Sequence, residues 1–136
     1  MKKRMTISII LALVLCFGMV APVFAGSPAV DFDFRLNTGS ESDYVFGCKT
    51  DRADYADIFP RGGNVNSSSY ILFNISQYKD GELKRLTYQV PSSGLEPMQI
   101  FYYNSVNMDD IQWKTLRLYA TRYGQGTVSM NGIWYP

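Results

Sequence analysis

The chain of 136 residues contains no histidine and only two cysteines. Without an imidazole, the Ser-His-Asp and Cys-His arrangements of hydrolases are excluded, together with the usual histidine-containing zinc sites. Because Cys16 lies in the apolar N-terminal stretch, the part of the chain after that stretch has Cys48 alone and no internal disulfide. We expect Cys48 to be buried, as free cysteines commonly are, and the fold to depend on packing.

The sequence also lacks an excess of charge of either sign. It has 13 basic and 12 acidic residues, a net charge of +1. Three of the basic residues lie at positions 2–4, so residues 26–136 carry 10 − 12 = −2. A near-neutral, mixed surface has no electrostatic footprint for DNA or RNA, and we expect no nucleic-acid partner.

A long hydrophobic run occurs only at the N-terminus. A basic start at residues 2–4, an apolar stretch at residues 7–20 and a small-x-small ending at residues 23–25 are typical of a secretory signal peptide. The apolar stretch is shorter than the roughly 20 residues of a membrane span. We therefore expect residues 1–25 to be cleaved after Ala25, leaving residues 26–136 as a single β domain of a secreted, bacterial protein with no transmembrane segment.

Alternation with a period of two is the main structural signal in the rest of the chain. Residues 30–36 alternate Val, Phe and Leu with Asp and Arg, which predicts a strand with one buried face. Asp80-Gly81 predicts a tight hairpin turn. Further strands are predicted at residues 44–49, 70–78, 83–90, 98–103, 113–123 and 127–134. About seven strands indicate an all-β fold, a single antiparallel β-sandwich, with a small barrel or a jelly roll as the alternative.

The predicted core follows from the apolar members of these strands. The C-terminal segment with Trp134 is expected to dock onto the domain; the alternative is an exposed aromatic tail that engages a partner, and the sequence does not decide between the two. The core residues are expected to be Val30, Phe32, Phe34, Phe46, Ile71, Phe73, Leu86, Ile100, Leu116, Leu118, Val128 and Trp134.

Residues 51–58 show no alternation and are predicted to form one or two helical turns. On such turns Asp51, Asp54 and Asp57 would come together and could hold a calcium ion. The spacing differs from that of an EF-hand, so solvent-exposed charges are the simpler interpretation, and no other cofactor is expected. A second carboxylate pair, Asp31 and Asp33, has a separation of about 7 Å along one strand that would suit a glycosidase. We expect this pair to form a solvated outer face.

Aromatic residues are abundant, with eight Phe, ten Tyr and two Trp. Tyrosines that share an exposed face could stack on sugar rings or on an apolar partner surface, although they could equally only stiffen a sheet. The candidates are Tyr70, Tyr78, Tyr102, Tyr103, Tyr119 and Tyr123. We expect a non-enzymatic binding protein of the cell envelope or extracellular surface, with cell-wall glycan or an extracellular protein as partner. The alternatives are a bacteriocin- or toxin-like effector and a small carbohydrate-active hydrolase.

Overall fold

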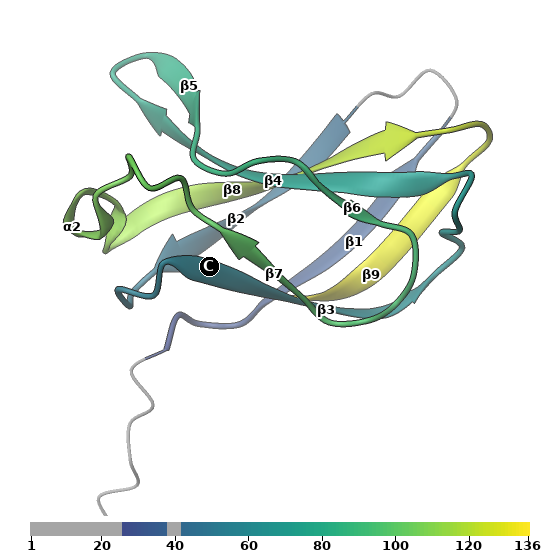
Figure 1. Cartoon of the computed structure of the whole chain (residues 1–136), viewed down its shortest axis with the longest axis horizontal. Helices are drawn as coiled ribbons and strands as arrows, with labels where there is room; N and C mark the ends of the chain where they lie inside the picture. Colours follow the sequence, from purple (N-terminus) through teal and green to yellow (C-terminus); the bar gives the residue numbers. More distant parts are fainter. Residues whose placement is uncertain (1–25, 38–41) are drawn as a thin grey trace, which may run out of the picture.

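A computed structural model describes residues 26–37 and 42–136, and the predicted signal peptide at residues 1–25 lies outside the described residues. Two antiparallel sheets pack face to face in this part of the chain (Figure 1). The predicted all-β sandwich is confirmed, with nine strands instead of about seven. The described strands form two separate sheets and not one closed barrel.

The four-stranded sheet has the order β1-β9-β3-β7, and the five-stranded sheet has the order β2-β8-β4-β5, with β6 also paired to β4. The four-stranded sheet consists of β1 (Val30–Leu36), β9 (Val128–Tyr135), β3 (Tyr55–Gly63) and β7 (Met98–Phe101). The five-stranded sheet consists of β2 (Ser42–Lys49), β8 (Lys114–Tyr123), β4 (Tyr70–Lys79), β5 (Glu82–Arg85) and β6 (Val90–Ser92). A short helix, α2 (Met108–Ile111), precedes β8.

Period-two alternation in β1 places apolar side chains between the sheets and charged side chains outside. Phe32, Phe34 and Leu36 are buried. The intervening Asp31 and Asp33 are exposed, as expected for a solvated outer face.

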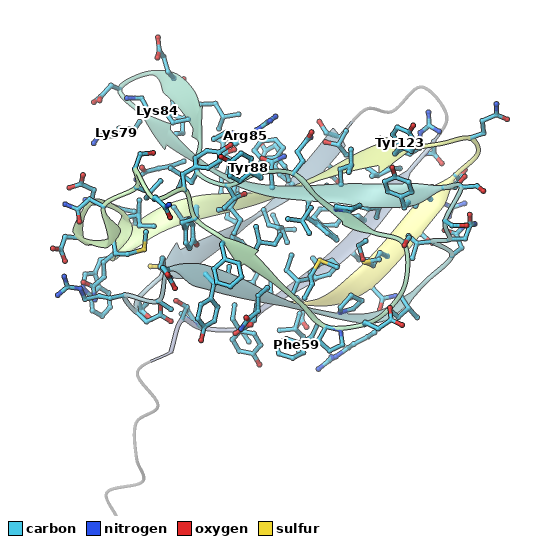
Figure 2. All side chains as sticks on the ribbon, viewed as in Figure 1. Phe59, Lys79, Lys84, Arg85, Tyr88 and Tyr123 are labelled. Carbon is cyan, nitrogen blue, oxygen red and sulfur yellow. The ribbon has the colours of Figure 1, made fainter. Side chains whose placement is uncertain are left out.

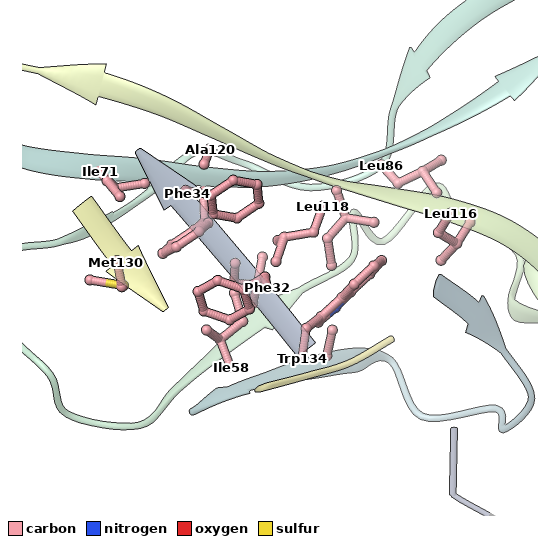
Figure 3. Packing of buried hydrophobic residues seen from close by; sticks show 14 of the residues in the cluster. Phe32, Phe34, Ile58, Ile71, Leu86, Leu116, Leu118, Ala120, Met130 and Trp134 are labelled. Atoms are coloured by element: carbon pink, nitrogen blue, oxygen red, sulfur yellow. The ribbon is translucent and has the colours of Figure 1, made fainter. Parts of the chain in front are cut away.

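The core lies between the two sheets and is rich in aromatic rings (Figure 3). Ten of the twelve predicted core residues are buried, including Phe73, which packs its ring against those of Phe32 and Phe34. Trp134 is fully buried because β9 lies between β1 and β3, so the expected docking of the C-terminal segment is confirmed. Val30 is only half-buried, although it packs against the core.

The twelfth predicted core residue, Phe46, is 53% exposed, and that prediction is wrong. The neighbouring Gly47 faces the core instead, because a Cβ on it would lie only 2.7 Å from the Trp134 ring. The large indole therefore occupies the space that a side chain at position 47 would need. The same alternation turns Cys48 outward, where it is half-buried, so the expectation of a buried cysteine is also wrong.

The helical turns predicted for residues 51–58 do not form, because this segment leads into β3. Ala56 and Ile58 are buried at alternate positions of the strand. β3 pairs with β9 on one side and with β7 on the other. Pro60 lies within the strand, next to an irregularity in the register between Pro60 and Gly62.

The predicted hairpin at Asp80-Gly81 is confirmed, with φ angles of 56° and 82° in the left-handed region that this turn requires. The strand predicted at residues 83–90 is divided into β5 and β6. Figure 1 shows the β4–β5 hairpin projecting away from the outer side of the five-stranded sheet.

Candidate functional site

The outer face of the five-stranded sheet collects aromatic side chains from three adjacent strands. Residues directly opposite each other in a sheet point to the same face, and Tyr44 pairs with Tyr119 while Tyr70 pairs with Tyr123. Their rings lie close together, with centroids 5.1 Å apart in the first pair and 4.7 Å apart in the second. We call this surface the aromatic face; its members are Tyr44, Phe46, Tyr70, Tyr78, Tyr119 and Tyr123.

Four of the six tyrosines that the sequence singled out therefore lie on one face, and two lie elsewhere. Tyr102 is only 5% exposed and belongs to the core, so its expected place on a surface is wrong. Burial, reinforced by the charge of Asp51, raises the pKa of the Tyr102 hydroxyl well above its usual range. Tyr103 stacks edge-on against the exposed Tyr88, outside the aromatic face.

Arg117 occupies the middle of the aromatic face. Its guanidinium carbon lies 4.9 Å from the ring centroid of Tyr44 and 5.2 Å from that of Phe46. A third ring, that of Tyr78, is 5.3 Å away, and Nη1 donates a hydrogen bond of 3.2 Å to the Tyr119 hydroxyl. This bond raises the pKa of Arg117. The side chain is therefore a permanent positive charge held in place by cation–π contacts.

A hollow of about 340 Å³ lies beside this cluster and is lined by residues of β2, β4, β5 and β8. Its aromatic wall is Tyr119, and Leu83 and Arg85 of β5 form the opposite wall. The full lining is Ser42, Asn74, Ser76, Leu83, Arg85, Tyr119 and Thr121.

The floor of the hollow is polar and buried. Asn74 and Ser76 occupy outward positions of β4, yet they are only 5% and 2% exposed. The Ser76 hydroxyl donates to Oδ1 of Asn74 at 3.1 Å, which orients the amide. Within the described residues, the amide nitrogen of Asn74 donates no side-chain hydrogen bond, and it is not one of the fully buried atoms that lack a partner. Its N–H groups are therefore available to a ligand in the hollow.

Most of this hollow is not predicted by the sequence pattern. The alternation of β8 placed Arg117 and Tyr119 on one face, but it did not show that β5 rises beside them. A usable signal was the pattern of β4, where Asn74 and Ser76 alternate with the apolar Phe73 and Ile75. The position of Arg85 beside Ser76 follows only from the register of β5 on β4.

The three aspartates considered for calcium do not come together as a set of three, although Asp51 and Asp57 line the same hollow of about 230 Å³. Asp51 lies in the loop after β2, Asp54 is exposed before β3, and Asp57 accepts a 3.0 Å hydrogen bond from Nε2 of Gln99. In residues 26–37 and 42–136, no group of three His, Cys, Asp or Glu side chains is placed to hold a metal ion.

Asp51 instead forms a salt bridge with the fully buried Lys49, with 2.7 Å between Nζ and Oδ1. Burial alone would raise the pKa of Asp51. The hydrogen bond and charge of Lys49, with the backbone N–H groups of Ser27 and Ala53, hold that pKa below its usual value.

The outer face of the four-stranded sheet has a broader hollow, of about 520 Å³. Figure 2 shows its Phe59 on the opposite side of the molecule from Arg85 and Tyr123. Ile133 and Tyr135 complete the apolar part of the lining. None of the lining side chains is buried, so no polar group is held at a floor there.

The sequence matches no known protein-family model and has no significant match among characterised protein sequences. In the part of the chain that the structure describes, no helix is long and apolar enough to cross a membrane. The geometry of the sandwich and its hollow is therefore the basis for any functional argument.

Proposed function

We propose that this protein is a secreted, non-enzymatic binding protein that holds a glycan on the outer face of its five-stranded sheet. The observation that carries the proposal is the hollow with a buried Asn74–Ser76 floor beside the Tyr119 ring. Aromatic rings supply apolar contact area, and a few fixed polar groups supply orientation, which is the usual composition of a small-ligand site. A sugar presents both an apolar ring face and hydroxyl groups to such a surface.

The lining of the hollow supports binding without hydrolysis. Glycoside hydrolysis requires two carboxyl groups on either side of the scissile bond, and the described residues that line the hollow include neither Asp nor Glu. The chain has no histidine to act as an alternative acid or base. The pair considered for a hydrolase, Asp31 and Asp33, lies exposed on the other sheet.

Secretion is part of the proposal and is supported by the composition of residues 1–25. The expected product begins at Gly26, immediately before β1 and the sandwich. Mass spectrometry of the protein exported by its source cells should give the mass of residues 26–136. Detection of the first 25 residues in the exported protein would contradict the proposed cleavage.

Replacing Tyr119 with Ala tests the binding site. Tyr119 forms one wall of the hollow and accepts the hydrogen bond from Arg117, so Tyr119→Ala should weaken glycan binding at least tenfold, which corresponds to about 1.4 kcal/mol. The measurement is retention of the purified protein on isolated cell-envelope polysaccharide, with thermal unfolding as the check on folding.

The matched control is Tyr135→Ala, which removes a tyrosine from the outer face of the four-stranded sheet. This variant should bind as the unmodified protein does. The proposal is wrong if the unmodified protein retains no polysaccharide, or if both variants lose binding to the same extent while they remain folded.

A further inference from the structure

Two arginines flank Ser76 on the outer face of the five-stranded sheet. Ser76 of β4 pairs with Arg117 on β8 and with Arg85 on β5. All three residues therefore point to the same face in one row across three strands. Adjacent strands are about 4.8 Å apart, so the two arginine backbones are separated by only about 10 Å.

Among the described residues of the five-stranded sheet, no negative charge compensates this row on its own face. The outward positions of β2, β4, β5, β6 and β8 include no Asp or Glu. The two ion pairs within the described residues lie elsewhere, between Lys49 and Asp51 and between Arg52 and Asp109. Two positive charges on one face without a carboxylate repel each other, and an anion bound on that face would relieve the repulsion.

The two arginines are held differently. Arg117 is fixed by three rings and by its bond to Tyr119. Arg85 is exposed, lines the hollow, and makes no side-chain hydrogen bond or ion pair within residues 26–37 and 42–136. Its planar set of N–H donors is free to bind a carboxylate or phosphate in a bidentate manner.

A third donor, Asn74, lies at the floor of the hollow, two residues from Ser76 along β4. Ser76 orients the Asn74 amide by donating to its Oδ1, which leaves the N–H groups of a 95% buried side chain without a side-chain partner in the described structure. An anionic oxygen in the hollow would accept hydrogen bonds from these N–H groups.

We propose that this row is an anion subsite, which binds the carboxylate or phosphate group of an acidic glycan over Ser76. Arg85 and the Asn74 amide donate hydrogen bonds to the anion, and Arg117 contributes a fixed positive charge. The sugar ring that carries the group lies against Tyr119. The inference rests on the proposed glycan-binding function and adds the charge of the ligand to it.

The test compares matched ligands that differ only in charge. Oligogalacturonate carries a carboxylate on every sugar, and its fully methyl-esterified form is the neutral counterpart. A glycerol-phosphate polymer represents phosphate as the source of charge. Isothermal titration should show that oligogalacturonate or the phosphate polymer binds at least tenfold more tightly than the neutral ester.

The matched pair of variants is Arg85→Gln and Lys84→Gln. Both remove one positive charge from β5, but Lys84 lies at the position that points away from Arg85. Arg85→Gln should reduce binding of the charged ligand to the level of the ester, whereas Lys84→Gln should change it less than twofold.

The failure of this inference is distinguishable from the failure of the proposed function. Equal binding of charged and esterified glycans, or equal effects of the two variants, overturns the anion subsite and leaves glycan binding intact. Loss of charged-ligand binding in Tyr119→Ala supports the shared site. If no polysaccharide binds, neutral or charged, the proposed function and the subsite are both wrong.

Discussion

At the scale of single residues, a glycine determines which face of β2 packs against the core. Phe46 is the larger and more apolar residue, so the sequence favours it for burial. Because a side chain at position 47 would clash with the Trp134 ring, Gly47 faces the core. Phe46 therefore lies on the outer face, where its ring packs against Arg117. A residue that would otherwise be counted as core thus becomes part of the aromatic face.

The expected effects of substitution on stability are therefore the opposite of those that side-chain size alone would predict. Gly47→Ala should destabilise the protein by about 1–3 kcal/mol, because its Cβ would press on the fully buried Trp134. Phe46→Ala removes a far larger side chain but should cost less than about 1 kcal/mol, since it loses mainly an exposed cation–π contact. Urea unfolding of both variants measures this, and a larger loss for Phe46→Ala would contradict the observed orientation of β2.

At the scale of elements, the β4–β5 hairpin makes the candidate site possible. Without its projection, Asn74 and Ser76 would lie on an open sheet and Arg85 would have no place beside them. The Asp80-Gly81 turn fixes the hairpin, and the left-handed φ of Gly81 is one that a side chain disfavours. Binding should therefore depend on a turn that does not line the hollow.

Gly81→Ala and Gly126→Ala form a matched pair for testing this dependence. Both glycines have similar φ angles, 82° and 79°, and neither would place a Cβ within 4 Å of other atoms. Each substitution should cost about 1 kcal/mol through backbone strain. Only Gly81→Ala should also weaken glycan binding, because only its turn holds the wall with Arg85; equal binding by the two variants would contradict this role of the hairpin.

Some of the strands could be predicted from the sequence and others could not. Strands with clear alternation, such as β1 and β8, were predicted because one buried face leaves a local period of two. β3 was not, since its extended form comes from pairing with β9 and β7, which are distant in the chain. The same limit applies to the site. Tyrosines of one strand could be grouped by alternation, but Arg85 and Arg117 lie in one row only through the register of three strands.

At the scale of the whole molecule, one group of polar contacts links the first and the last described residues to the end of β2. Asp51 accepts hydrogen bonds from the backbone and hydroxyl of Ser27, ahead of β1, and from Lys49 at the end of β2. Lys49 also donates to the carbonyl of Pro136 after β9, at 3.3 Å, and lies 5.0 Å from the Tyr102 ring centroid. Three segments far apart in sequence thus share one buried charge.

Removing the carboxylate should therefore destabilise the whole fold and not a single loop. Asp51→Asn leaves the fully buried Lys49 ammonium without its counter-charge. Because Asp51 is itself 24% exposed, the expected cost is about 1–3 kcal/mol, less than for a fully buried pair. Asp54→Asn, at an exposed aspartate nearby, is the matched control and should change the free energy of unfolding by less than about 0.5 kcal/mol.

The same group of polar contacts predicts an acid-dependent loss of stability. Since the folded state holds the pKa of Asp51 below its ordinary value of 3.8, the carboxylate contributes fully above that value. Its contribution is lost as the pH falls through the lower, folded-state pKa, because the unfolded chain then binds the proton more readily. The free energy of unfolding, measured by urea from about pH 6 to about pH 2, should fall less steeply in Asp51→Asn than in the unmodified protein or in Asp54→Asn. Parallel curves for all three would show that protonation of Asp51 is not the cause of the loss of stability in acid.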